Sequence, residues 1–367
     1  MSTIVVGLSG GVDSSVAAYL LKQQGNNVIG MFMLNWEDSD GSGRCNAQAD
    51  FEDARRVADK IGIPYYTVNY AIEYWDKVFQ YFLDEYRNGF TPNPDVLCNR
   101  EIKFGPFLQH AMAIGADKIA TGHYAKLVER DGQFYLYKAK DLNKDQSYFL
   151  HQLSQEQLSK TLFPLDEIEK PKVREIAKEL GLVTATKKDS TGICFIGERN
   201  FRQFMKTFLP AQPGEIRDLN DKVVGHHEGV MYYTIGQRRG LNIGGTADGN
   251  GERWFVVSKD VKRNILYVNE GECKEMFSDG LVINNMHWIN GTPTEKKFAC
   301  NIKCRYRQPD QKCEVEVVDD NKVIVHFVEA QRSVALGQYG VLYADDGMCY
   351  GGGRIDELIP IANWTKK

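Results

Sequence analysis

A glycine-rich loop near the start of the chain, GLSGGVDSS at residues 7–15, has the composition of a phosphate-binding loop. Glycines permit positive φ and let backbone N–H groups approach an anion closely, and a helix after the loop adds the positive end of its dipole. Two common nucleotide-binding patterns do not fit, because GxxxxGK[ST] requires a lysine that is absent here and GxGxxG does not match. The loop is therefore expected to serve a reaction that transfers no γ-phosphate.

The loop does match SGGxDS, the pyrophosphate loop of enzymes that cleave ATP between its α- and β-phosphates. Such a loop holds the departing pyrophosphate while AMP is attached to an oxygen. An apolar strand precedes it and a helix follows, with Asp13 as the expected N-cap. Met33 ends the second strand and Gly122 the fourth, at the sheet edge where ligands bind. The predicted ATP-binding residues are Gly7, Leu8, Ser9, Gly10, Gly11, Val12, Asp13, Ser14, Met33 and Gly122.

Two cysteines in polar loops are candidates for sulfur chemistry. Cys98 lies in TPNPDVLCNREIKFG (91–105), where two prolines predict a rigid loop before a helix. A position at or next to the helix start would favour its thiolate, and Asp95 is a candidate acid or base shortly before it. Cys194 lies in a second polar loop, DSTGICFIGERNF (189–201). Sulfur transfer between the two requires that the fold or a bound partner bring them together.

Seven segments occur in an order that is typical of one enzyme family: GLSGGVDSS, NPDVLCNREIKFG, ATGHYA, KDQSYFL, DSTGICFIGER, YTIGQRRGL and CRYRQ. From Val6 to about Ile355 the chain resembles the bacterial tRNA-specific 2-thiouridylases. The resemblance implies an ATP-dependent sulfurtransferase that adenylates the C2 oxygen of the wobble uridine in tRNA and replaces it with sulfur, giving 2-thiouridine. It implies ATP, with Mg²⁺ as the ATP complex, and three partners: tRNA, an upstream persulfide donor protein and a reductant.

The resemblance also implies roles for individual residues. Cys194 corresponds to the persulfide carrier and Cys98 to the nucleophile that attacks it, with a transient Cys98–Cys194 disulfide as the product. Asn93, Pro94 and Asp95 correspond to the segment that meets the target base, with Asp95 as the acid/base group. The remaining positions implied to contact tRNA are His123, Lys144, Asp145, Gln146, Arg305, Tyr306 and Gln338.

Elementary chemistry agrees with this activity. The C2 carbonyl of uridine is a poor electrophile, and adenylation gives it AMP as a leaving group that a low-pKa sulfur can displace. A base in a single-stranded anticodon loop leaves its stack at modest cost. Two alternatives stay open: another adenylating ligase of the same superfamily, and a non-catalytic tRNA-binding module with a vestigial nucleotide fold. The intact loop, Asp95 and the two cysteines weigh against the second.

Hydrophobic patterns indicate the elements that position these residues. Buried strands are expected at 3–8, 27–34, 65–70 and 117–122, and helices at 13–24, 50–60, 71–86 and 101–114. This alternation predicts an α/β doubly wound parallel sheet of the adenine-nucleotide alpha-hydrolase type. Later short strands with turn signals, including a hairpin around Asp319–Asn321, predict a small middle domain and a C-terminal β-barrel. The expected domains are residues 1–205, 206–276 and 277–367.

Composition narrows the class of protein. The 367 residues carry a formal net charge of −4, which argues weakly against indiscriminate nucleic-acid binding. A local basic groove is still possible, with KK (187–188), QRRG (237–240) and CRYR (304–307) as candidates. The eight cysteines form no CxxC, and His226 and His227 lack a ligand set, so no zinc or iron–sulfur site is predicted. No apolar run reaches the roughly 18 residues of a membrane span, and the protein is expected to be cytosolic.

Overall fold

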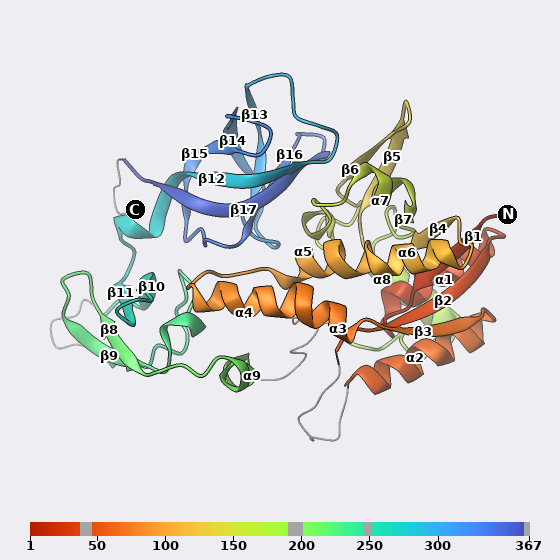
Figure 1. The fold of residues 1–367 in the computed structure, drawn as a ribbon, viewed down its shortest axis with the longest axis horizontal. Helices are drawn as coiled ribbons and strands as arrows, with labels where there is room; N and C mark the ends of the chain where they lie inside the picture. The colour runs from red at the N-terminus through yellow and green to blue at the C-terminus, as the bar shows by residue number, and fades with distance from the viewer. Residues whose placement is uncertain (37–45, 190–200, 245–250, 363–367) are drawn as a thin grey trace.

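The computed structural model describes residues 1–36, 46–189, 201–244 and 251–362. An N-terminal α/β unit, a small sheet and a closed β-barrel follow one another along the chain (Figure 1). None of the helices in these ranges combines the length and the hydropathy that crossing a membrane requires.

A five-stranded parallel sheet is the centre of the N-terminal unit, in the order β3-β2-β1-β4-β7. Its middle strand carries Ile4, Val5 and Val6, which are almost completely buried, as a strand covered on both faces requires. The predicted fold class is therefore confirmed, with β7 as an additional edge strand. The strands are β1 (Thr3–Gly7), β2 (Asn27–Leu34), β3 (Tyr65–Asn69), β4 (Lys118–Ala120) and β7 (Thr161–Leu162).

Helices cover this sheet, and two of the helical stretches between β3 and β4 contain π-helical segments. Such segments are frequent at functional sites. The α-helices of the unit are α1 (Val12–Gln23), α2 (Asn46–Ile61), α3 (Ala71–Tyr74), α4 (Gln80–Arg87), α5 (Pro94–Cys98), α6 (Pro106–Ala113), α7 (Gln155–Ser159) and α8 (Lys170–Glu179). The π-helical segments are Trp75–Phe79, which joins α3 to α4, and Asn99–Lys103, which continues α5.

A β-hairpin that the sequence patterns did not predict lies beside the sheet. It consists of β5 (Lys126–Arg130) and β6 (Gln133–Tyr137). Its turn is Asp131-Gly132, and both residues have positive φ, 51° and 75°. An Asp-Gly pair between two β-rich runs is a strong hairpin signal, so the sequence did contain the information.

The second half of the chain forms a four-stranded sheet and then a six-stranded closed barrel. Helix α9 (Phe201–Phe208) precedes the small sheet, whose strands are β8 (Gly214–Arg217), β9 (Val223–His227), β10 (Trp254–Asp260) and β11 (Ile265–Glu270). The barrel consists of β12 (Phe277–Trp288), β13 (Lys297–Lys303), β14 (Gln311–Val317), β15 (Val323–Arg332), β16 (Tyr339–Tyr343) and β17 (Cys349–Pro360). The β14–β15 hairpin turns at the predicted place, and Cys300 and Cys304 are buried beside Ile302 in the barrel core.

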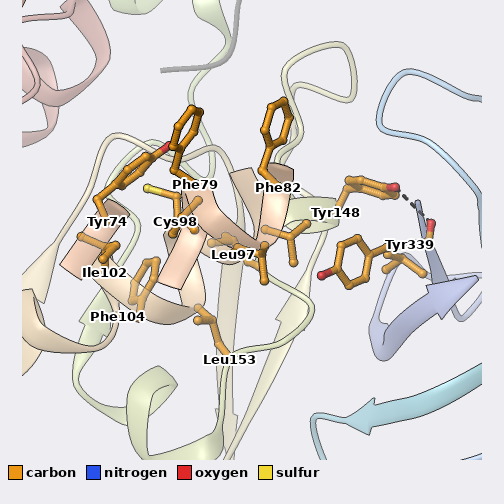
Figure 2. Close-up of a cluster of buried hydrophobic side chains, with 14 of the residues drawn as sticks. Tyr74, Phe79, Phe82, Leu97, Cys98, Ile102, Phe104, Tyr148, Leu153 and Tyr339 are labelled. Atoms are coloured by element: carbon orange, nitrogen blue, oxygen red, sulfur yellow. Dashed lines mark hydrogen bonds between the residues drawn. The ribbon is translucent and has the colours of Figure 1, made fainter. Parts of the chain in front are cut away.

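One hydrophobic cluster connects all three units. It contains Phe79 and Phe82 from the long helical stretch, Tyr232 from the middle unit and Tyr339 from the barrel. Figure 1 shows α4 running beneath the barrel toward the small sheet, and Figure 2 shows the hydroxyl of Tyr148 directed at Tyr339, the first residue of β16. That hydroxyl donates a hydrogen bond of 3.0 Å to the Tyr339 carbonyl. The barrel is therefore packed directly against the N-terminal sheet unit.

A buried histidine at this junction makes stability depend on pH. The His151 ring lies 5.0 Å from that of Tyr339, and its Nδ1 lies 2.6 Å from the Tyr148 carbonyl. Burial lowers the pKa of His151 to about 3, although the Tyr148 carbonyl opposes the shift. Below about pH 6.5 the unfolded chain therefore binds a proton that the folded chain does not, and stability falls as the pH falls.

We expect the destabilisation caused by His151→Gln to be about 1 kcal/mol smaller at pH 5.5 than at pH 7.5, because the variant lacks this titration. Urea unfolding at the two pH values measures the difference. His110→Gln is the matched control, since His110 is exposed. Equal destabilisation by His151→Gln at both pH values would contradict the prediction.

Candidate functional site

The loop between β1 and α1 has the geometry of an anion-binding site. Gly11 is the N-cap of α1, and the hydroxyls of Ser14 and Ser15 donate to its carbonyl at 3.1 and 2.7 Å. The Ser9 amide donates to Ser14 Oγ at 3.2 Å, which folds the loop onto the helix start. The first N–H groups of a helix have no partner within the helix, so this arrangement leaves them available to an anion.

The prediction that Asp13 caps α1 is wrong, because its carboxylate is engaged elsewhere. Lys170 Nζ lies 2.7 Å from both carboxylate oxygens, and the Tyr124 hydroxyl donates to Oδ1 at 2.8 Å. Only 6% of Lys170 is exposed, and its Nζ also lies 2.8 Å from Asp189 Oδ1. An ion network around the buried Lys170 therefore ties the start of α8 to the start of α1.

Asp189 gathers three cations at the edge of this network. Lys144 and Arg174 approach its carboxylate at 2.6 Å each, and Lys170 at 2.8 Å. Burial acts to raise the pKa of Asp189, but the hydrogen bonds from Lys144 and Lys170 outweigh it and bring the pKa to about 2. Asp189 is therefore ionised at neutral pH, and it anchors the chain just before residue 190.

The two predicted ATP-binding residues outside the loop lie against it. A Cβ built at Gly122 would lie 2.6 Å from the backbone nitrogen of Ser14, so only glycine fits beside the start of α1. A Cβ at Gly7 would lie 3.3 Å from Met33 Cε. Leu8 and Val12 are buried, so they can offer only backbone groups to a ligand.

The candidate sulfur site lies on α5. Asn93 is the N-cap, its Oδ1 accepts a 3.2 Å hydrogen bond from the Asp95 amide, and Pro94 occupies the first turn. Cys98 is the last residue of α5, and the π-helical segment continues from it. The expectation that Cys98 lies at a helix start is therefore wrong, because the Asn93 cap begins the helix one turn earlier. The positive end of the helix dipole therefore gives no reason to expect Cys98 to be a thiolate.

The Cys98 side chain faces the core. It is 1% exposed and lies among Tyr74, Phe79 and Ile102 in Figure 2. Cys194, the predicted persulfide carrier, lies outside the described residues, so its pairing with Cys98 stays a prediction.

One ammonium group, that of Lys103, acts on two of the predicted functional residues. Burial raises the pKa of Asp95, and the charge of Lys103 opposes the shift. Burial lowers the pKa of His123 well below its usual value, and Lys103 lowers it further. His123 is therefore neutral, with Nδ1 2.8 Å from Thr121 Oγ1. Lys103 thus acts on both a carboxyl group that is easier to protonate than usual and a neutral imidazole.

The barrel holds the segment that leads into α5. Gln338 Nε2 donates to the carbonyls of Thr91 and Pro92 at 2.7 and 3.3 Å. Arg354 of β17 forms a 2.9 Å ion pair with Glu85 of α4. Gln338 is predicted to contact tRNA, and the structure places it against the two residues directly before the segment predicted to meet the target base.

The segment 144–146 meets the barrel at Tyr306. The Tyr306 hydroxyl lies 3.5 Å from the Lys144 carbonyl, and its ring lies 4.4 Å from that of Phe149. Asp145 is 3% exposed and accepts hydrogen bonds within the protein, so its carboxylate faces the interior. Gln146 Oε1 accepts from the Tyr124 amide at 3.1 Å.

Arg305 is exposed and donates to the Arg332 carbonyl at 3.1 Å. Among the positions implied to contact tRNA, Lys144 and Tyr306 meet at one barrel contact, and Gln338 lies at another. These contacts with tRNA stay predictions.

Sequence reasoning missed the residues that brace the loop: Tyr124, Lys170, Lys187 and Asp189. The KK pair at 187–188 was noted only as a candidate for a basic groove. No spacing rule connects such residues to a loop more than 100 positions earlier, since the fold alone brings them together. Only Asp189 had a signal in the sequence, because it is the first residue of the family-typical DSTGICF segment.

Comparison with known proteins places the chain among relatives along nearly its whole length. Family models for a tRNA methyl transferase HUP domain, a tRNA methyl transferase PRC-barrel domain and an aminomethyltransferase beta-barrel domain match residues 2–198, 202–270 and 278–355. The chain is 56% identical over 356 residues to the tRNA-specific 2-thiouridylase MnmA of Bacillus cytotoxicus, covering 97% of this chain and 95% of the relative. The Bacillus anthracis protein of the same name gives the same identity and coverage.

Solved structures match part of the chain. NMN synthetase from Francisella tularensis matches with a TM-score of 0.33 at 17% identity, covering 56% of this chain and 71% of that one. A 4-thiouridine synthetase in complex with RNA and bound ATP matches with a TM-score of 0.34 at 18% identity, covering 57% and 50%.

The close approach at Gly122 gives a direct test of the predicted nucleotide site. Gly122→Ala puts a methyl group 2.6 Å from the Ser14 amide nitrogen, so the start of α1 must move. We expect ATP affinity to fall by about tenfold or more, the effect of losing one hydrogen bond to a charged group. Calorimetric titration with ATP measures it. Gly244→Ala is the matched control, because nothing lies within 4 Å of its added Cβ. Unchanged ATP affinity in Gly122→Ala would show that the site lies elsewhere.

Proposed function

This chain belongs to the tRNA-specific 2-thiouridylase family, and we propose that it uses ATP to replace the C2 oxygen of the wobble uridine in tRNA with sulfur, giving 2-thiouridine. One observation carries the proposal: a single unit holds both an anion-binding SGGxDS loop and the Asn93–Cys98 helix. Phe107 lies 3.6 Å from a Cβ built at Gly7 and belongs to the same buried cluster as Cys98. Relatives with the thiouridylase name share 56% of its residues over 97% of its length.

The loop amides, the Ser9 hydroxyl and the start of α1 would hold the pyrophosphate portion of ATP. Bound ATP would supply the adenylyl group that turns the C2 oxygen into part of a leaving group, with AMP and pyrophosphate as products. Met33 and Gly122 would flank the nucleotide at the carboxyl edge of the sheet. Both oxygens of Asp13, the loop's own carboxylate, are bound to Lys170, so Mg²⁺ would be held by the phosphates of ATP rather than by this residue.

The sulfur step balances with two cysteines and one reductant. The Cys98 thiolate attacks the inner sulfur of a persulfide on Cys194, and a Cys98–Cys194 disulfide forms. The outer sulfur leaves with its electron pair and bonds to C2, while the C2–O bond breaks and the oxygen departs with AMP. A reductant then returns two electrons to the disulfide, and an upstream donor reloads Cys194. Asp95 would move the proton that this exchange requires.

The barrel and the segments it contacts would bind the tRNA. Arg305 offers an exposed charge, and Tyr306 an aromatic face of the kind that stacks on unpaired bases. Asn93, Pro94 and Asp95 would meet the extruded uridine. We also propose the domain division 1–205, 206–276 and 277–367, with the chemistry in the first domain.

Reconstitution tests the proposal directly. Enzyme, ATP, unmodified tRNA and a persulfide donor are incubated, and the digested tRNA is examined by nucleoside mass spectrometry. We expect 2-thiouridine from the wild type and none from Cys98→Ser or Cys194→Ser. Cys273→Ser is the control, because this cysteine is buried in a separate small cluster. Failure of the wild type to form 2-thiouridine would contradict the proposal. Pyrophosphate exchange that responds to a carboxylic acid and ignores tRNA would favour the ligase alternative.

The role of Asp95 predicts a shift in the pH profile. Burial raises the pKa of Asp95 and Lys103 opposes it, so Lys103→Met should raise that pKa further. If Asp95 acts ionised, the acid limb of the rate profile then moves to higher pH, while Lys103→Arg keeps the limb near its original position. Asp95→Asn should lower the rate by about 100-fold. Single-turnover thiolation of prebound tRNA between pH 5 and 8 measures both effects. An acid limb that Lys103→Met does not move would rule out this role for Asp95.

A further inference from the structure

The pyrophosphate loop has no lysine of its own, but a lysine from much later in the chain is bound to it. Lys187 Nζ donates to the Gly10 carbonyl at 2.9 Å and to the carboxylates of Asp50 and Asp53 at 2.7 and 2.6 Å. About a third of the Lys187 side chain is exposed, 31%. Burial acts to lower the pKa of Lys187, but its hydrogen bonds with Asp50 and Asp53 outweigh this and raise it. The three donors of a charged ammonium group are thus committed to three oxygens.

The bond from Lys187 fixes the direction of one peptide group. Gly10 has a φ of +72°, and the described residues contain no cis peptide bond. In a trans peptide the C=O and the next N–H point in opposite directions. Because Lys187 holds the Gly10 carbonyl, the Gly11 N–H must point away from the lysine. Gly11 is the N-cap of α1, so this N–H belongs to the amides at the helix start.

The peptide between two glycines would otherwise be free to flip. Glycine accepts positive and negative φ about equally, so sterics alone do not choose an orientation. Within the described residues, Lys187 is the one hydrogen-bond partner of the Gly10 carbonyl, whereas Ser14 and Ser15 hold the next carbonyl, that of Gly11. A Cβ at Gly10 would lie 2.3 Å from the Asp50 carbonyl oxygen, so α2 also packs directly on this residue.

We propose that Lys187 is a positioning residue for the nucleotide site, which orients the Gly10–Gly11 peptide so that its N–H faces the pyrophosphate, while Asp50 and Asp53 hold the lysine in place. Other phosphate loops use a lysine to contact phosphate, whereas this lysine acts on the loop itself. The inference rests on the proposed ATP site and is independent of tRNA and of sulfur transfer.

The test compares Lys187→Ala with Lys188→Ala, a neighbouring exposed lysine, in the full chain without tRNA. Binding of inorganic pyrophosphate with Mg²⁺ and binding of adenosine are measured separately by calorimetry. We expect Lys187→Ala to weaken pyrophosphate binding by about tenfold, as for one hydrogen bond to a charged group. Adenosine affinity should stay unchanged, because the nucleoside makes no use of this peptide. Lys187→Arg, which keeps a cationic donor, should recover part of the loss.

Amide hydrogen exchange in the ligand-free protein separates positioning from direct contact. A loosened peptide should speed exchange across residues 7–15 in Lys187→Ala but not in Lys188→Ala. Unchanged pyrophosphate affinity in Lys187→Ala would overturn the inference, and so would weaker pyrophosphate binding without faster exchange. Equal loss of adenosine and pyrophosphate binding would also overturn it, because it would indicate general damage. If the wild type binds no pyrophosphate, the loop assignment fails and the inference fails with it, while thiolation activity remains a separate measurement.

Discussion

The candidate site depends on the backbone amide groups at the start of α1 and on the loop that orients them. A helix offers its first N–H groups to an anion only if the preceding loop is held in one conformation. Here the loop is held from several directions at once. Ser14 and Ser15 fix the Gly11 carbonyl, Lys187 fixes the Gly10 carbonyl, and Gly122 packs against the helix backbone. The short loop is therefore braced by segments from the whole N-terminal unit.

The barrel also holds the segment that leads into α5. The residues that would meet the target base follow directly after Thr91 and Pro92, whose carbonyls are bound by Gln338. The ion pair between Arg354 and Glu85 reinforces the same contact one helix earlier. The unit proposed to bind tRNA is thus in direct contact with the segment proposed to do chemistry. Cys98 lies at the far end of that segment, buried in the cluster that the units share.

Local patterns predicted the elements well and their mutual contacts poorly. Four of the five strands of the parallel sheet and the β14–β15 hairpin lie where apolar runs and turn residues placed them. The Asp13 cap failed because a buried lysine competes for its carboxylate, and a lysine at position 170 gives no local signal of that. Cys98 was misplaced relative to its helix because the Asn93 cap was not recognised as the helix start. The contact of Lys187 with the loop was missed for the same reason as that of Lys170. Tertiary structure alone brings these two lysines to the loop.

The central claim is that the loop activates the C2 oxygen by adenylation, and the fate of that oxygen tests it most directly. A tRNA carrying ¹⁸O at C2 of the wobble uridine is thiolated in a single turnover with ATP and a persulfide donor. The account predicts that the ¹⁸O appears in AMP, one atom for each 2-thiouridine formed. Thiolation with the ¹⁸O in water or in pyrophosphate, and with unlabelled AMP, would contradict it.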